Sequence, residues 1–142
     1  MKAKRSKGSR APRQKRGGKL SGAGSAFPVF LIEDNRDLSD SLATMLSAQG
    51  LSVLATARNG PEALAQVARL KPKIVLVDAA LGDRGSLSLV KAVRKASPGI
   101  KVIVMHLATG HRDVISFVRA GVSGFIMKAA SPAEFVRTIR LV

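Results

Sequence analysis

Three residue types are missing from this chain of 142 residues: it contains no cysteine, no tryptophan and no tyrosine. Without cysteine there is no disulfide framework, no thiolate zinc site and no thiol catalysis, and such a composition suits a reducing compartment. No apolar run approaches the roughly 20 residues that a membrane helix needs, and the N-terminus lacks the apolar core of a secretory signal. We therefore expect a cytoplasmic protein without membrane insertion.

Acidic residues are missing from the first segment of the chain. Residues 1–26 carry nine Lys or Arg side chains and no Asp or Glu, so they supply +9 of the formal net charge of +15. Because the segment is rich in Gly, Ser and Ala and has no hydrophobic period, we predict a basic disordered tail before a folded domain at 27–142. Such a tail would attract nucleic acid without sequence preference, or serve only as a solubilising arm. The residues assigned to the nucleic-acid contact are Lys4, Arg5, Lys7, Arg10, Arg13, Lys15 and Arg16.

Short apolar runs and helical periods alternate through the rest of the chain. Runs of about four apolar residues are typical of strands buried on both faces of a parallel sheet. Strands are predicted at 29–32, 51–55, 74–77, 102–105 and 124–127, the second of them more exposed. Helices are predicted at 37–49, from 61 to before 71, around 87–93, around 114–118 and from 132 onward. The alternation predicts an α/β fold with a parallel sheet and helices on both faces.

Charged side chains follow three of these strands at the point where each strand ends. Glu33 and Asp34 come after the first strand, Asp78 after the third and Lys128 after the fifth. In open α/β sheets the ligand site lies beyond the carboxyl ends of the strands, so these groups should converge. Three crowded carboxylates require a proton or a cation, and Mg²⁺ prefers such oxygen ligands.

This arrangement predicts chemistry at phosphorus. Glu33, Asp34 and Asp78 would hold Mg²⁺, and the Asp78 carboxylate would then attack phosphorus to form an acyl phosphate. Lys128 would meet a phosphoryl oxygen as a point charge.

The same residues resemble the receiver domain of two-component response regulators, from about residue 28 to 142. The resemblance rests on the pair Glu33-Asp34, on Ile-Val-Leu-Val-Asp78 44 positions later, and on Phe-Ile-Met-Lys128 a further 50 positions on. The stretch 119–134 is especially similar to receivers that precede a helix-turn-helix output domain. The resemblance implies a doubly wound, flavodoxin-like (βα)5 fold with strand order 2-1-3-4-5.

The resemblance also implies a function in phosphorelay signalling. A sensor histidine kinase would phosphorylate Asp78 with Mg²⁺ as cofactor, and the switch positions would be His106 and Phe125. The phosphorylated domain would act on an unknown downstream protein, as a switch rather than a metabolic enzyme. A homodimer is among the alternatives for its oligomeric state.

Two places depart from the family pattern. His106 stands where the family has a Thr or Ser hydroxyl that bonds the phosphoryl group, and Gly82 and Ser86 stand where it has Pro and Gly. The alternative hypothesis is therefore a degenerate receiver, a protein-interaction module that works without phosphorylation. The phosphoacceptor hypothesis is preferred because an interaction module has no physical need for clustered charge.

Overall fold

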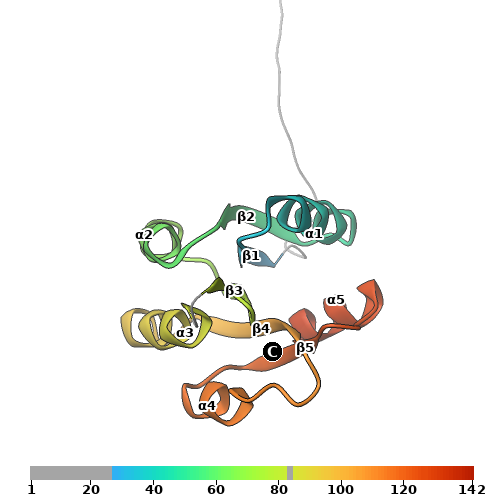
Figure 1. Cartoon of the computed structure of the whole chain (residues 1–142). Coiled ribbons are helices and arrows are strands. Elements are labelled where there is room, and N and C mark those ends of the chain that lie inside the picture. Colours follow the sequence, from blue (N-terminus) through green and yellow to red (C-terminus); the bar gives the residue numbers. More distant parts are fainter. Residues whose placement is uncertain (1–26, 83–84) are drawn as a thin grey trace, which may run out of the picture.

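The computed structural model describes residues 27–82 and 85–142 (Figure 1). The basic segment 1–26 lies outside the described residues, as do 83 and 84 in the loop after the third strand. The predicted disorder of the tail and its nucleic-acid contacts therefore stay predictions.

Within the described residues, five strands and five helices alternate along the chain. The strands are β1 (Pro28–Ile32), β2 (Ser52–Ala57), β3 (Ile74–Asp78), β4 (Lys101–Leu107) and β5 (Gly124–Met127). The helices are α1 (Arg36–Ala48), α2 (Gly60–Leu70), α3 (Gly85–Ala96), α4 (Val114–Arg119) and α5 (Pro132–Leu141). The strands form one parallel sheet in the order β2-β1-β3-β4-β5. This confirms the predicted doubly wound fold and its strand order.

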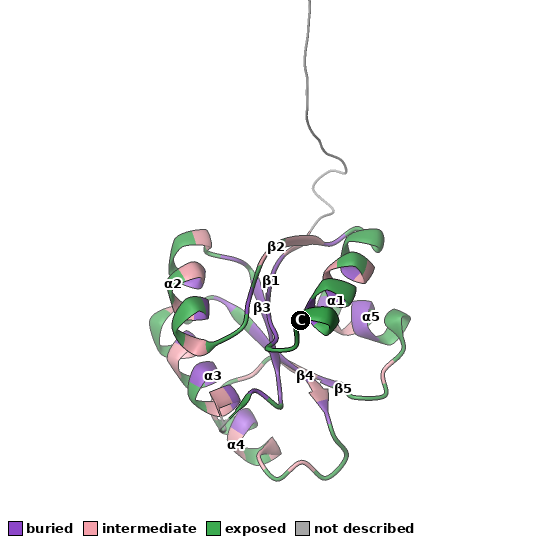
Figure 2. Ribbon diagram, turned by 45° about the horizontal axis from the view of Figure 1, so that its top comes forward, coloured by how far each residue is buried: buried purple, intermediate pink, exposed green. Residues whose placement is uncertain are grey.

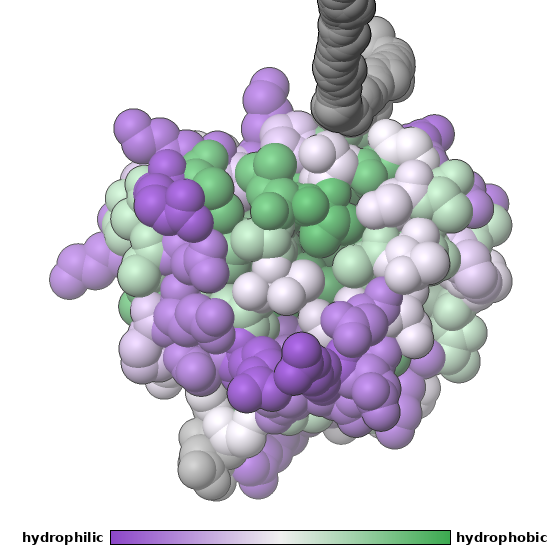
Figure 3. All heavy atoms as spheres, turned by 90° about the horizontal axis from the view of Figure 1, so that it is seen from above, coloured by the Kyte–Doolittle hydropathy of each residue, from purple (hydrophilic) through white to green (hydrophobic). Residues whose placement is uncertain are grey.

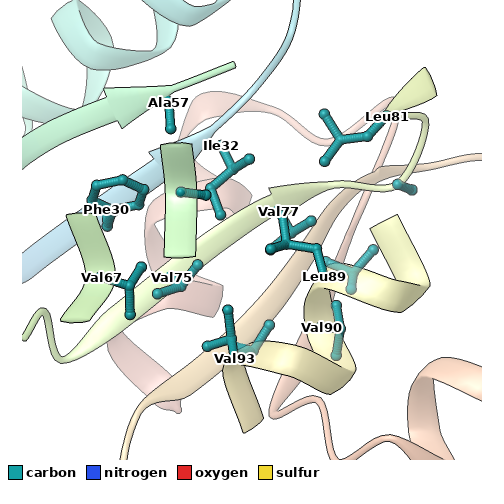
Figure 4. Packing of buried hydrophobic residues seen from close by; sticks show 14 of the residues in the cluster. Phe30, Ile32, Ala57, Val67, Val75, Val77, Leu81, Leu89, Val90 and Val93 are labelled. Carbon is teal, nitrogen blue, oxygen red and sulfur yellow. The ribbon is translucent and has the colours of Figure 1, made fainter. Parts of the chain in front are cut away.

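Both faces of the sheet are buried, which explains the continuous apolar runs. Alternate residues of β1 point to opposite sides: Phe30 packs toward α2 and α3, and Leu31 packs toward α1 and α5. Figure 4 shows the first of these clusters, in which Phe30 and Val75 from the sheet lie near Val67 of α2 and Val93 of α3. Figure 2 shows the buried sheet between two sets of helices whose outer surfaces are exposed. The helix layers therefore hold the central strands from both sides.

Local signals in the sequence determine where several helices begin. The Asn59 side chain caps α2 by accepting from the backbone N–H of Glu62 at 2.9 Å. At α5, the Ser131 hydroxyl accepts from the N–H of Glu134 while the Glu134 carboxylate accepts from the N–H of Ser131. The second arrangement is a capping box, and each cap satisfies backbone N–H groups that have no partner within the helix.

The largest differences from the predicted strand boundaries, two residues each, are at the ends of β2 and β4. β2 lies at Ser52–Ala57 instead of 51–55, because its pairing with β1 continues to Ala57. β4 continues to Leu107 instead of ending at Met105, since Leu107 pairs with Met127 of β5. The second difference matters because it includes His106 in the strand.

The edge strand β2 is more exposed than its neighbours, as predicted. Its Leu54 is 39% exposed, whereas residues 29–32 of β1 are fully buried. Figure 3 views the molecule onto this side, where hydrophobic side chains gather beside a band of hydrophilic ones. None of the helices in the described part of the chain is long and apolar enough to cross a membrane.

Candidate functional site

Three polar side chains meet where β1, β3 and β4 end. Glu33 directly follows β1, Asp78 is the last residue of β3, and His106 lies one residue before the end of β4. Glu33 is 1% exposed and Asp78 is 6% exposed. One oxygen of each carboxylate and one ring nitrogen of His106 lie within 4.8 Å of one another. The sheet order brings them together, because β1 and β3 are hydrogen-bonded neighbours and β4 pairs with the other side of β3.

A bulge in β4 determines where His106 points. Val104 pairs with Phe125 and Leu107 with Met127, so β4 has one residue more than β5 over this interval. His106 has a φ of +57°, a left-handed conformation that few non-glycine residues adopt. Regular alternation would turn His106 toward α2 and α3, but its ring lies 6.2 Å from that of Phe135 on α5. The extra residue therefore directs the imidazole toward the side of α1 and α5.

The three side chains are only partly satisfied by hydrogen bonds. Glu33 Oε2 accepts from the N–H of Asn35 at 3.1 Å, and Asp78 Oδ1 accepts from the N–H of Ala80 at 2.9 Å. His106 Nδ1 lies 3.5 Å from Glu33 Oε1 and 3.9 Å from Asp78 Oδ2. Among the described residues, Glu33 Oε1 and His106 Nδ1 are the buried side-chain polar atoms without a hydrogen-bond partner. Such atoms are rare in folded proteins and point to a proton, water or ion between them.

Burial and the hydrogen bonding within the cluster separate the proton affinities of the two acids. Burial, reinforced by the neighbouring Asp78, raises the pKa of Glu33 to about 8. Burial would also raise the pKa of Asp78, but His106, Glu33 and the Ala80 amide outweigh it and lower this pKa below its ordinary value. At neutral pH, in the absence of a cation, Asp78 carries the negative charge and Glu33 holds a proton.

Asp34 and Lys128 line the same cavity without joining the cluster of three. The cavity has a volume of about 520 Å³ and is also lined by Glu33, Asp78, His106 and His111. Both Asp34 and Lys128 are exposed. In the described part of the chain, both ion pairs within 4.0 Å involve His106. Among residues 27–82 and 85–142, the imidazole, rather than the predicted lysine, is thus the basic group nearest to Asp78.

Phe125, the other predicted switch residue, lies on β5 and is half-buried. Its ring lies 6.3 Å from that of Phe117 on α4, in an edge-to-face arrangement. It therefore packs against α4.

Ser86, at the start of α3, has a role that sequence reasoning did not identify. Its hydroxyl donates to the backbone carbonyl of Asp78 at 2.6 Å and accepts from the N–H of Leu81 at 3.0 Å. Ser86 is 2% exposed, so these bonds are shielded from water. The only signal in the sequence was a serine at a position where the family has glycine, which carries no information about its partners.

The fold and the edge of clustered polar groups define a class, the flavodoxin-like α/β proteins with their site at the carboxyl ends of the strands. The chain belongs to the response regulator receiver domain family, whose model matches residues 29–140. This family functions in two-component phosphorelay signalling.

Individual relatives agree with this assignment. The chain is 32% identical over 115 residues to the response regulator GacA of Pseudomonas viridiflava, covering 80% of this chain and 54% of GacA. It is 28% identical to the chemotaxis protein CheY of Thermotoga maritima, covering 80% of this chain and 95% of CheY. The crystal structure of a LuxR-family two-component response regulator from Aurantimonas sp. has a TM-score of 0.77 at 23% identity, covering 82% of this chain and 84% of that one. The chain thus spans about half the length of GacA and nearly all of CheY.

Proposed function

We propose that this chain receives a phosphoryl group on Asp78 from a sensor histidine kinase, with Mg²⁺ as cofactor. Response regulators act together with such kinases, and their receiver domains are generally not enzymes. The observation that carries the proposal is the convergence of Glu33 and Asp78 at the carboxyl edge, with Asp34 and Lys128 lining the same cavity.

The donor set fits Mg²⁺. The unpartnered Glu33 Oε1 and the Asp78 carboxylate provide oxygen atoms at one edge, and the exposed Asp34 is close enough to line the same cavity. Mg²⁺ is commonly held by one or two carboxylates together with water and phosphate oxygens. When bound, it would neutralise charge on the incoming phosphoryl group.

The residues of this chain would act as follows. An oxygen of Asp78 forms a bond to phosphorus while the bond between phosphorus and the kinase histidine nitrogen breaks, which leaves an acyl phosphate and a free histidine. The low pKa of Asp78 supports this role, because the carboxylate is ionised at neutral pH. The Ala80 N–H holds Oδ1 at 2.9 Å, which leaves Oδ2 for the attack. Lys128 would stabilise a phosphoryl oxygen from the cavity wall.

The output of the switch would be a change in the surface around α4 and β5. Exposed apolar side chains gather there: Ile115 and Val118 on α4 are 65% and 57% exposed, and Met127 on β5 is 43% exposed. Phe125 packs against Phe117 beneath this surface. This region would have two packings that lie close in energy. Phosphorylation would favour one of them and so alter the affinity for a downstream protein.

A degenerate receiver is the second candidate, and one observation favours it. His106 replaces the family hydroxyl, and its Nδ1 lies 3.9 Å from Asp78 Oδ2. An imidazole at this place is bulkier than a hydroxyl, so it would compete with the phosphoryl group for space. In that case the domain would bind its partner without phosphorylation.

The experiment that separates the two candidates uses a small-molecule phosphodonor. The full chain is incubated with the donor and Mg²⁺, and intact mass and phosphorus NMR are recorded. The proposal predicts a gain of one phosphoryl group in the wild type and in Asp40→Asn, an exposed site on α1, but not in Asp78→Asn. Equal incorporation in wild type and Asp78→Asn would refute Asp78 as acceptor. No Mg²⁺-dependent incorporation in any of them would favour the degenerate receiver.

A further inference from the structure

Two unpartnered buried atoms face each other at the carboxyl edge. Glu33 Oε1 and His106 Nδ1 are 3.5 Å apart, and Glu33 is 1% exposed. A buried polar atom without a partner costs about 1–3 kcal/mol, so a structure that retains two of them is suited to a ligand between them. We infer that His106, Glu33 and Asp78 together bind a borderline divalent ion of the Zn²⁺ class, and that this ion blocks phosphorylation of Asp78.

The spacing of the three side chains suits such an ion. Zn²⁺ lies about 2.0–2.2 Å from imidazole nitrogen and carboxylate oxygen, so neighbouring ligand atoms in a tetrahedral site are roughly 3.4 Å apart. His106 Nδ1 lies 3.5 Å from Glu33 Oε1 and 3.9 Å from Asp78 Oδ2. These two separations are within about 0.5 Å of that value, and all three ligand atoms lie within 4.8 Å of one another, so closing the site needs shifts of up to about 1 Å. The fourth position would face the cavity, which leaves it to water.

The donor types favour Zn²⁺ more than a purely acidic pocket would. Imidazole nitrogen is a good ligand for Zn²⁺ and related ions, whereas Mg²⁺ selects oxygen ligands and water. Two carboxylates and a neutral imidazole also balance the charge of a divalent ion. A hydroxyl at position 106 would provide no such nitrogen, so the specificity comes from a residue of this chain and not from the family pattern.

The fold holds His106 in place for this role. The bulge in β4 and the φ of +57° direct the ring, and Phe135 packs 6.2 Å from it. His111 lines the same cavity, but its Nδ1 accepts from the N–H of Asp113 at 3.1 Å and is already occupied. Residues 1–26 contain no His, Cys, Asp or Glu, so the tail offers no competing side-chain ligand. His111 is thus a matched control within the same cavity.

The blocking effect rests on the proposed function of Asp78. The ion would be held by the carboxylate that must attack phosphorus, which lowers its nucleophilicity. The coordinated imidazole would also stay in the space that a phosphoryl oxygen needs. Zn²⁺ would therefore oppose the reaction that Mg²⁺ supports, and the domain would respond to the ratio of the two ions.

Metal titrations of the full chain test the site without reference to phosphorylation. Zn²⁺ and Mg²⁺ binding are measured by calorimetry, and Co²⁺ is used as a coloured substitute whose visible spectrum distinguishes four-coordinate from six-coordinate sites. The variants are His106→Asn and His111→Asn. Asparagine suits position 106 because it tolerates a left-handed backbone better than a β-branched residue does. Thermal unfolding of each variant confirms that it is folded.

The expected result is specific to His106. Losing this ligand should weaken Zn²⁺ binding on the order of 100-fold and abolish the four-coordinate Co²⁺ spectrum, while Mg²⁺ affinity changes by less than about threefold. His111→Asn should behave as wild type. Because most sites bind Zn²⁺ more tightly than Mg²⁺, the decisive quantity is the change in the ratio of the two affinities. Equal Zn²⁺ affinity in wild type and His106→Asn would overturn the inference.

A second arm separates this inference from the proposed function. Zn²⁺ is added to the phosphodonor reaction with Mg²⁺, and it should suppress incorporation in wild type and much less in His106→Asn. Normal phosphorylation together with Zn²⁺ binding that is independent of His106 retains the function and overturns the metal site. The opposite result is also informative. If Zn²⁺ binding depends on His106 but no phosphorylation occurs under any condition, the metal site is supported, and both the blocking effect and the proposed function are wrong.

Discussion

The two edges of the sheet hold cavities of opposite character. At the amino ends of the strands, a cavity of about 770 Å³ is lined by apolar side chains and by Lys71, Lys73 and Lys101. At the carboxyl ends, a smaller cavity of about 520 Å³ contains Glu33, Asp78 and His106. The lysines are exposed and can be hydrated, whereas Glu33 and Asp78 are buried. The comparison shows that the candidate site is identified by unsatisfied polar atoms and not by cavity size.

The difference has an energetic consequence. Burying ionisable groups costs stability unless they are paired. The groups at the carboxyl edge should therefore lower the free energy of unfolding of the free protein. The amino edge carries no such penalty. We therefore expect substitutions at the carboxyl edge to change the phosphorylation rate or the free energy of unfolding. Substitutions at the amino edge should leave both nearly unchanged.

Among variants that keep Asp78, the largest effect should follow from Lys128→Ala. We expect the rate of Asp78 phosphorylation to fall about 100-fold, because a charge that stabilises the transferring phosphoryl group is lost. The free energy of unfolding should change by less than about 0.5 kcal/mol, since Lys128 is exposed. Rates are measured by intact mass with a small-molecule donor, and Lys91→Ala on the exposed face of α3 is the control. Equal rates in both variants would exclude Lys128 from the reaction.

Ser86→Ala should produce the next largest effect. The change removes a hydrogen bond to the Asp78 carbonyl and leaves the buried N–H of Leu81 without a partner. The expected loss is about 1–3 kcal/mol in the free energy of unfolding, measured by denaturant titration. Ser88→Ala, on the exposed face of the same helix, should be nearly neutral. If the two variants are equally stable, the hydroxyl of Ser86 does not support the loop after β3.

Much of the fold could be predicted from the sequence because its signals are local. Apolar runs marked the strands, and helical periods marked the helices between them. The strand order was inherited from the family resemblance, since periodicity carries no information about it. Convergence at the carboxyl edge then followed from the parallel sheet.

The arrangement within the site could not be predicted in the same way. The bulge that turns His106 depends on how β4 pairs with β5, and the bonds of Ser86 depend on the path of the loop after β3. Both are tertiary contacts without a local signature. The exposure of Asp34, next to the buried Glu33, also depends on the geometry with which the chain leaves β1.

Glu33→Gln should remove a pH dependence of stability. The folded-state pKa of Glu33, about 8, lies above its ordinary value of 4.5, so the folded chain holds this proton more tightly than the unfolded chain. In the absence of metal, the corresponding stability is fully present below about pH 4.5 and is lost as the pH rises through 8. Because the pKa of Asp78 is lowered, its contribution to stability changes only below about pH 3.8, outside this window.

The measurement is the free energy of unfolding of wild type and Glu33→Gln at pH 5 and pH 9. From pH 5 to pH 9, the free energy of unfolding of the wild type should fall by on the order of 2 kcal/mol more than that of the variant. Asp40→Asn is the control and should follow the wild type. Parallel curves for wild type and Glu33→Gln would show that Glu33 does not bind a proton on folding.

The smallest effects should come from the amino edge. Lys73→Ala and Lys101→Ala remove exposed charges beside the larger cavity, so we expect less than about 0.5 kcal/mol in stability. Phosphorylation should proceed at the wild-type rate. A marked loss of phosphorylation in either variant would show that the amino edge affects the site at the carboxyl edge.

The most direct test of the account is the effect of Mg²⁺ on thermal unfolding of the wild type and of a variant with both Glu33→Gln and Asp78→Asn. If the carboxyl edge is a cation site, Mg²⁺ at ten times its dissociation constant stabilises the wild type by about 1.4 kcal/mol, which raises the unfolding temperature by several degrees. The double variant should be unaffected. An equal rise in both proteins, or none in the wild type, would contradict the claim that these buried carboxylates hold a cation.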